Sequence, residues 1–214
     1  MEVKLSIPTT LNEITLGQYQ EFSKLDITKE SEVQSKMIEI FCKVPTNVVR
    51  SMKAKDITDI CTIINNMFDV EHQMLNRFDL NGVKYGFIPD LENMSFGEYV
   101  DLDTFMGDND NLHRAMNVLY RPIDLLQGQR YTLKEYDPDI NEEAKNYPLD
   151  ACFGAMVFFY DLGKDLSTVI LNSSSKQNEE NLAQYLGSLQ NGDGTIPSMQ
   201  SLAEILQDLK ISLN

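Results

Sequence analysis

The chain lacks several features on which common catalytic and binding sites depend. It has no tryptophan, two histidines and three cysteines among its 214 residues. His72 and His113 are far apart, and neither has a cysteine or second histidine at the spacing of a zinc site. No serine stands in a Gly-x-Ser-x-Gly turn, and neither a phosphate-binding loop nor a dinucleotide fingerprint is present. We therefore expect no catalytic residues, no metal site and no cofactor, and we predict that the protein is not an enzyme.

Positive charge is scarce. Lys and Arg number 18 against 33 Asp and Glu, which gives a formal net charge of −15. Nucleic-acid backbones and anionic membranes bind surfaces with a surplus of cations, so we expect neither direct nucleic-acid binding nor membrane binding. The charge instead favours basic surfaces of other proteins as partners. An acidic inhibitor that mimics DNA stays open as an alternative, and it needs carboxylates concentrated on one face.

Long apolar runs and a leader pattern are also missing. The longest apolar run lies within residues 151–160, about half the length that a bilayer requires. The first residues, Met-Glu-Val-Lys-Leu-Ser, contain no apolar leader core. Cys42, Cys61 and Cys152 each lie among apolar residues, and we interpret them as buried thiols in a reducing compartment. We expect a protein that is assembled in a cytosol.

A motif that occurs twice predicts two helix starts. Its copies run from Ile7 to Phe22 and from Ile88 to Leu102, and each begins Ile-Pro and ends near Gly-[Gln/Glu]-Tyr. Thr15 and Ser95 are placed as N-cap residues, with Gln or Glu three positions later, which is the pattern of a capping box. The apolar residue before each cap and the tyrosine four positions after it form a hydrophobic staple. The glycine two positions after each cap suggests a close approach of neighbouring backbone.

Further patterns predict an N-terminal helical cluster followed by a hairpin. Ser31 to Gln34 is a third capping box, and apolar residues at helical spacing mark a further helix over 56–68. Apolar and polar residues then alternate on both sides of Asn81-Gly82, which predicts a two-residue turn. In the predicted register Leu80 pairs with Val83 and Phe78 with Tyr85.

The following stretch predicts a second helical region. One helix has Leu112, Ala115, Met116 and Leu119 on one face and ends at Arg121-Pro122. A strand is predicted over 131–136. Pro148 suits the first turn of a helix through about residue 171, which we predict to be the central buried helix because apolar residues through Leu162 cover most of its circumference.

The last part of the chain predicts an arm. Residues 172–180 are the most polar stretch, and amphipathic helices follow on both sides of Asn191-Gly-Asp-Gly194. The last helix carries an apolar stripe that we predict to bind protein, the alternative being that it covers the protein's own core. The stripe consists of Met199, Leu202, Leu206, Leu209 and Leu213.

These patterns predict a mainly α fold of the α+β class. We expect a helical bundle-like core domain over residues 1–171, with a small antiparallel sheet that includes a hairpin near 75–88. A C-terminal amphipathic helical arm is expected over residues 172–214. Asp101-x-Asp103 and Asp137-x-Asp139-x-Asn141 depart from a calcium loop, so we interpret them as solvated acidic segments.

Three stretches carry a resemblance to a known class of proteins. They are Ile14 to Phe22, Leu119 to Ile123 and Phe158 to Leu166. Together they resemble small acidic proteins encoded among the structural genes of tailed bacteriophages, particularly crAss-like phages and relatives that infect Bacteroides-type hosts. The resemblance implies a non-enzymatic virion protein of the neck or tail, such as a ring or connector protein.

The resemblance also implies partners and a location. A ring or connector protein contacts copies of itself and other phage structural proteins, and it is part of a virion assembled in the bacterial host cytoplasm. The alternative that the resemblance leaves open is a tail assembly chaperone, which binds a tail component only transiently.

Overall fold

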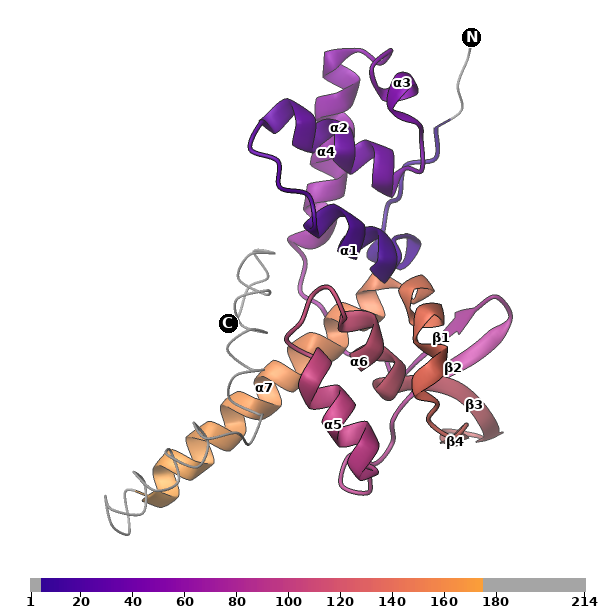
Figure 1. Ribbon diagram of the computed structural model, residues 1–214, viewed down its shortest axis with the longest axis vertical. Coiled ribbons are helices and arrows are strands. Elements are labelled where there is room, and N and C mark those ends of the chain that lie inside the picture. Colours follow the sequence, from indigo (N-terminus) through magenta and orange to yellow (C-terminus); the bar gives the residue numbers. More distant parts are fainter. Residues whose placement is uncertain (1–4, 175–214) are drawn as a thin grey trace.

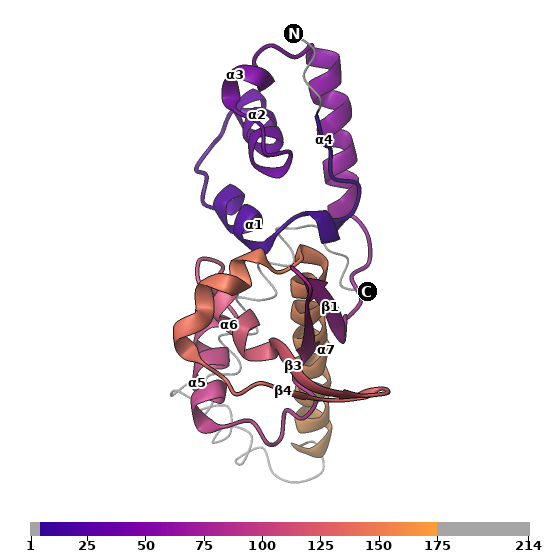
Figure 2. The same cartoon turned by 90° about the vertical axis from the view of Figure 1, so that its right-hand side faces the viewer.

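A computed structural model describes residues 5–174 of the chain. These residues form a mainly helical α+β fold, as predicted. Figures 1 and 2 show two groups of elements stacked along the long axis of the molecule. We call residues 5–68 the helical group and residues 77–174 the sheet group. The predicted arm over 172–214 lies almost wholly outside the described residues.

The helical group consists of short helices around an aromatic core. Its elements are η1 (Leu11–Glu13), α1 (Leu16–Ser23), α2 (Glu30–Phe41), α3 (Thr46–Val49) and α4 (Ala54–Phe68). Helix α4 confirms the helix predicted over 56–68. Phe41 links Phe22 to Phe68, with ring centroids 5.2 and 6.0 Å apart. The Phe68 ring centroid in turn lies 6.1 Å from that of Phe153 in the sheet group, so the aromatic core joins the two groups.

Thr15 and Ser95 begin helices as predicted. The backbone N–H of Gln18 donates to Thr15 Oγ1 at 3.3 Å, and the Gln18 side-chain oxygen accepts from the Thr15 N–H at 3.0 Å. The matching distances between Ser95 and Glu98 are 3.3 and 2.7 Å. Both capping boxes are therefore present, and α1 and α5 (Phe96–Phe105) begin directly after the caps.

The third predicted capping box, from Ser31 to Gln34, is wrong. Helix α2 begins before Ser31, and Lys29 occupies the cap position, where its side chain accepts no capping hydrogen bond from a helix N–H. Gln34 instead donates to the Glu30 carboxylate at 3.3 Å. Glu30 and Glu32 place negative charge in the first turn, where the helix dipole favours it, and this provides an alternative to a capping hydroxyl.

The predicted hairpin is confirmed. Strands β1 (Arg77–Leu80) and β2 (Val83–Phe87) are antiparallel, with Leu80 opposite Val83 and Phe78 opposite Tyr85. Asn81 and Gly82 both have positive φ, 51° and 81°, as a two-residue turn of this type requires. The Phe78 and Tyr85 rings stack with centroids 5.3 Å apart.

Strand β3 (Tyr120–Gln127) lies where the sequence pattern did not indicate a strand. Helix α6 (Leu112–Leu119) ends before Arg121-Pro122 as predicted, but the chain continues at once as β3. A proline normally argues against a central strand because it lacks an N–H. Here Pro122 lies opposite Tyr85, and its carbonyl accepts the Lys134 N–H at 2.9 Å.

The sheet has four antiparallel strands in the order β1-β2-β3-β4. Strand β4 (Arg130–Leu133) overlaps the strand predicted over 131–136, but it begins one residue earlier and ends three residues earlier, and its partner is β3. An irregularity between Ile123 and Leu125 shifts the register of this outer pair. Figure 2 shows the β3–β4 hairpin projecting from the body on the side away from α5.

Helix α7 (Leu149–Ser174) follows η2 (Pro138–Asn146) and is only partly the buried helix that was predicted. Its residues 151–156 are all buried, but Leu162, predicted to lie on the buried face, is 38% exposed. Helix α7 extends away from the rest of the sheet group (Figure 1), which explains this difference. At Gly154 an added Cβ would collide with the Gln73 carbonyl, so glycine allows the connecting chain to cross the helix.

The three cysteines are buried and free, as interpreted from the sequence. Burial raises the pKa of Cys42 to about 11 and also raises the pKa values of Cys61 and Cys152. Within residues 5–174, no helix has the length and apolar character needed to cross a membrane.

Candidate protein-interaction surfaces

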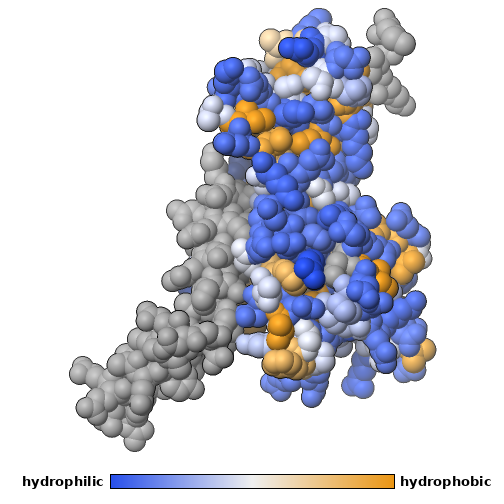
Figure 3. Space-filling view, in the orientation of Figure 1, coloured by the Kyte–Doolittle hydropathy of each residue, from blue (hydrophilic) through white to orange (hydrophobic). Residues whose placement is uncertain are grey.

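Helix α5 exposes a row of apolar side chains. Phe96 is 82% exposed and Tyr99 is 44% exposed, and Val100 is also exposed. These positions are i, i+3 and i+4, so they share one side of the helix. We call these three residues the α5 face. Figure 3 shows hydrophobic residues at the surface where Figure 1 places α5.

The opposite side of α5 is buried, which leaves the α5 face outward. Leu102 and Met106 are buried in the core. The Glu98 carboxylate forms an ion pair with Arg121 of β3, with Oε1 and Nη1 2.9 Å apart. Near the end of the helix, the Arg114 guanidinium lies 3.9 Å from the centre of the Phe105 ring. These contacts fix α5 on the sheet group, so the α5 face is a preformed surface.

The α5 face lies within the most one-sidedly charged stretch of the described chain. Residues 88–111 contain seven Asp or Glu and no Lys or Arg. Asp101 accepts a hydrogen bond from the Tyr136 hydroxyl at 2.7 Å. Burial and this hydrogen bond to the carboxylate raise the pKa of Tyr136, so the phenol stays neutral and acts as the donor. The surface around the α5 face is therefore both apolar and acidic.

A second exposed apolar surface lies at the end of the β3–β4 hairpin. Leu125 is 59% exposed, and Leu126 beside it is also exposed. The turn has Gly128 at a positive φ of 63°. The Arg77 guanidinium donates to the Gln129 side chain at 2.7 Å, which brings a cation to the turn. We call residues 125–130 together with Arg77 the hairpin tip.

Tyr131 attaches the hairpin to the rest of the sheet. Its hydroxyl donates to the Phe87 carbonyl at 2.6 Å. Its ring lies over Gly86, where an added Cβ would come within 2.5 Å of the ring. The hairpin is thus held at its base while its leucines remain exposed at the end.

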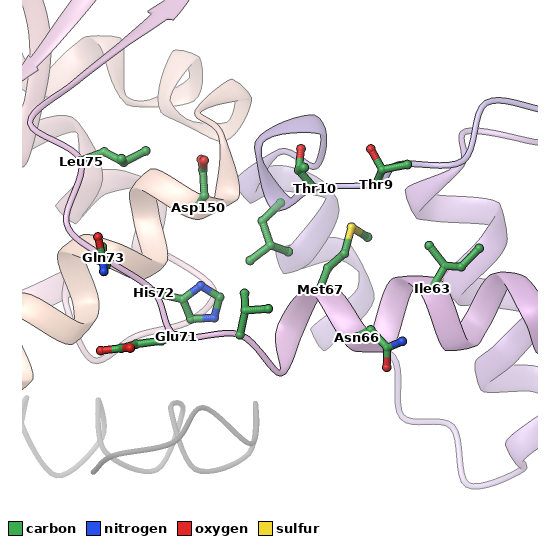
Figure 4. A pocket seen from close by; sticks show the side chains of 12 residues that line it. Thr9, Thr10, Ile63, Asn66, Met67, Glu71, His72, Gln73, Leu75 and Asp150 are labelled. Atoms are coloured by element: carbon green, nitrogen blue, oxygen red, sulfur yellow. The ribbon is translucent and has the colours of Figure 1, made fainter.

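A cleft between the helical group and the sheet group is one candidate for a small-molecule site. Its volume is about 630 Å³. Figure 4 shows Thr9 and Thr10 on one wall, and His72 and Asp150 on the other side. Burial lowers the pKa of His72 and raises the pKa of Asp150. The Asp150 carboxylate accepts the Ala151 N–H at 2.8 Å.

The arrangement in the cleft does not support a catalytic mechanism. A nucleophile needs a base within hydrogen-bonding distance and a group that orients the base. The Thr9 hydroxyl donates to the Glu13 carboxylate at 2.8 Å instead of facing His72. His72 packs edge-on against Phe153, with ring centroids 5.2 Å apart, and its Nε2 is sealed from solvent. His72 is therefore best explained as part of the core that joins the two groups.

The described residues contain no group of three or more His, Cys, Asp or Glu side chains arranged to hold a metal ion. In the acidic loop after β4, the Asp137 carboxylate accepts the Asp139 N–H at 2.9 Å and thereby caps η2. This local hydrogen bond gives Asp137 a structural role.

The predicted protein-binding stripe lies outside the described residues, so its role stays a prediction. It comprises Met199, Leu202, Leu206, Leu209 and Leu213. The α5 face and the hairpin tip were not predicted as interaction surfaces. The capping box at Ser95 could have indicated the α5 face. It predicts a helix at this point, and helical spacing then places the three residues of the α5 face on one side and Leu102 on another. No local pattern indicated the hairpin tip, since β3 itself was missed.

No protein-family model, curated protein or solved structure matches the chain.

Proposed function

We propose that the protein is a non-enzymatic structural component of a tailed-bacteriophage virion, a ring or connector protein of the neck or tail. In this proposal it acts through contacts with other proteins. The observation that carries the proposal is the α5 face. Phe96, which is 82% exposed on a well-anchored helix, together with the exposed Tyr99 and Val100 forms a contiguous apolar surface of the kind that protein interaction sites use.

The resemblance to phage structural proteins supports the virion as the location. Its three stretches lie at the start of α1, at the junction of α6 and β3, and along α7. The first stretch contacts a histidine through Gln20, whose amide lies 3.2 Å from His113 Nδ1 in the core. Residues 14–22 and 119–123 build the core and its connections, as expected of a protein whose role is to hold a shape.

The first test is the composition of purified virions. Particles are purified from lysates of cells that produce the protein, and quantitative mass spectrometry measures its copy number against the portal protein. We expect the protein at a fixed ratio, because ring components occupy symmetric positions. If it is abundant in the lysate and absent from purified particles, the virion role is wrong, and a tail assembly chaperone becomes the better interpretation.

The second test removes the α5 face. Phe96→Ser leaves the buried side of α5 intact, so the variant should fold normally. We expect it to reduce the yield of complete particles when it replaces the natural protein. Ile140→Thr, which alters an exposed apolar residue on η2, is the matched control. Equal particle yields from Phe96→Ser and the natural protein would argue against the α5 face as an assembly surface.

A further inference from the structure

The α5 face and the hairpin tip differ in charge although both are apolar. The α5 face lies within residues 88–111, which have seven acidic and no basic residues. The hairpin tip carries two arginines, because Arg77 donates to Gln129 and Arg130 pairs with Gln127 across the strands. Its residues 125–130 contain no acidic residue, and Asp124 is the carboxylate next to it in the chain. In a chain with a net charge of −15, this combination of exposed leucines and arginines stands apart.

We propose that the α5 face of one copy binds the hairpin tip of a second copy. This inference rests on the proposed function and deepens it by naming the partner of the α5 face. Successive side chains of a strand point to opposite faces, so Leu125 and Arg130 share one face of the hairpin and Leu126 lies on the other. Leu125 would pack against Phe96 and Tyr99, while Arg130 would face the carboxylates around α5. Complementary charge sets the register of such a contact and disfavours wrong pairings.

Charge also decides between this contact and a symmetric one. If two α5 faces met, each would bring its acidic surroundings: residues 88–111 contain seven Asp or Glu, of which Glu98 is paired with Arg121 and Asp110 with Lys24. Like charges placed across an interface weaken it. The contact with the hairpin tip avoids this repulsion and brings an arginine to the remaining carboxylates.

The positions of the two surfaces allow a repeating assembly. The hairpin projects from the side of the sheet group away from α5 (Figure 2), and Tyr131 holds it to Phe87 and away from α5. One copy can therefore bind two neighbours, one through each surface. Such head-to-tail contacts form a ring where the rotation between copies closes and a filament where it does not.

The test uses complementary variants of the full chain. Phe96→Ser removes the α5 face and keeps the hairpin tip, whereas Leu125→Thr removes the tip and keeps the α5 face. Sedimentation velocity measures the mass of each protein over a range of concentrations, and circular dichroism with urea unfolding checks that each is folded. Ile140→Thr is again the control for an exposed apolar residue outside both surfaces.

We expect the natural protein and Ile140→Thr to form larger species as concentration rises. Each surface variant alone should raise the dissociation constant by about thirtyfold or more, the loss expected for a central aromatic or apolar anchor. An equimolar mixture of the two variants should form dimers, because each pair keeps one intact contact. The mixture should not extend further, since the remaining surfaces are defective.

Three results would overturn the inference. The natural protein could remain monomeric at its highest soluble concentration. The mixture could fail to dimerise although each variant is folded, which would show that the two surfaces do not bind each other. Phe96→Ser could prevent association while Leu125→Thr does not, which would indicate a symmetric contact between two α5 faces or another occupant of the α5 face. None of these results decides whether the protein is in the virion, which mass spectrometry tests separately.

Discussion

Thr15 and Ser95 cap their helices with the same pair of hydrogen bonds, yet the residues that follow them have opposite environments. Leu16, directly after the first cap, is fully buried, whereas Phe96, at the same position after the second cap, is 82% exposed. The tyrosines three positions further along differ in the same way, because Tyr19 is buried and Tyr99 is exposed. The first copy is therefore part of the core, and the second copy presents a surface.

The difference arises from what packs on each helix start. Helix α1 is covered: the Leu16 N–H donates to the Tyr147 carbonyl at 3.0 Å, and the backbone of Lys145 lies against Gly17. Around Gly97 nothing lies within 4 Å of an added Cβ. The predicted close approach of backbone is thus confirmed at Gly17 and wrong at Gly97. A repeated local motif specifies a helix start and leaves its environment open.

The largest expected difference concerns the residue after each cap. Leu16→Ala removes a fully buried side chain and should lower the free energy of unfolding by about 2–5 kcal/mol. Phe96→Ala removes an exposed side chain and should change it by about 0.5 kcal/mol or less. Urea unfolding of both variants measures the difference. A similar loss in both would mean that the α5 face is covered in the folded chain.

Gln18 and Glu98, the residues three positions after the two caps, each have a second partner outside the capping box. We therefore expect that neither residue can replace the other without a loss of stability. Glu98 also pairs with Arg121, and both side chains are largely buried, while the Gln18 amide donates to the Ile40 carbonyl at 2.5 Å. Glu98→Gln leaves the arginine without its anion, and Gln18→Glu removes the donor and buries a carboxylate. Each should cost about 2–3 kcal/mol.

Urea unfolding measures these two variants beside Glu32→Gln. Glu32 pairs with Lys29 on the exposed surface, so its loss should cost less than about 1 kcal/mol. Full stability of Glu98→Gln would show that Arg121 is satisfied without the carboxylate.

The free energy of unfolding should also depend on pH through His113, which contacts Gln20 in the first copy of the motif. The Gln20 amide lies 3.2 Å from His113 Nδ1, and burial, with a smaller contribution from Lys145, lowers the pKa of His113 from its ordinary value of 6.5. Burial lowers the pKa of His72 as well. Both histidines are neutral in the folded protein and bind protons more readily when unfolded. Their contribution to stability is therefore present above pH 6.5 and is lost as the pH falls below it.

The expected slope is up to about 1.4 kcal/mol per pH unit for each histidine. Unfolding free energies measured between about pH 7.5 and pH 5.5 test this expectation, in a range where most carboxylates stay ionised. His113→Gln should reduce the slope by removing one of the two titrating groups. A stability that rises towards acidic pH would contradict the neutral, buried state of these rings.

The caps themselves should behave alike. Thr15→Ala and Ser95→Ala each remove one side-chain acceptor from an otherwise similar box. Each should lower the free energy of unfolding by about 1 kcal/mol. Thermal melting compares the two directly. A much larger loss at Thr15 alone would show that the environment of the helix, as well as its start, depends on the cap.

The smallest expected difference concerns the glycines. Gly97→Ala adds a methyl group in open space and should stabilise the helix by up to about 1 kcal/mol. At Gly17 the added Cβ would lie 3.1 Å from the Lys145 carbonyl oxygen, so this gain should be cancelled or reversed. Melting temperatures of the two variants measure the sign at each site. Equal stabilisation would mean that η2 can move away from α1.

Several elements were predictable because their causes are local. The capping boxes at Thr15 and Ser95 depend on residues within one helical turn, and the turn at Asn81-Gly82 depends on two residues that accept positive φ. Strand β3 was not predictable in this way. Its sequence includes Pro122, and its strand character comes from pairing with Tyr85 and Phe87, which are distant in the chain.

The candidate surfaces also divide into features with local causes, which the sequence could predict, and features that depend on contacts between distant segments. Apolar residues around α7 predicted a buried helix, and the capping box predicted where α5 begins, but neither pattern could say which face meets the core. The Leu102 side of α5 is buried because α6 and β3 pack there, which leaves Phe96 outside. On α7 the packing covers Leu149 to Met156, and the helix then extends beyond the body.

By itself, the sequence determined the mainly helical fold, the helix starts at Thr15 and Ser95, the hairpin register and the strongly acidic charge. Each of these follows from neighbouring residues or from composition. Only the tertiary structure decided which copy of the repeated motif is buried and where the exposed leucines of the hairpin lie. Those outcomes depend on contacts between distant segments, because an apolar residue is buried only if another element covers it.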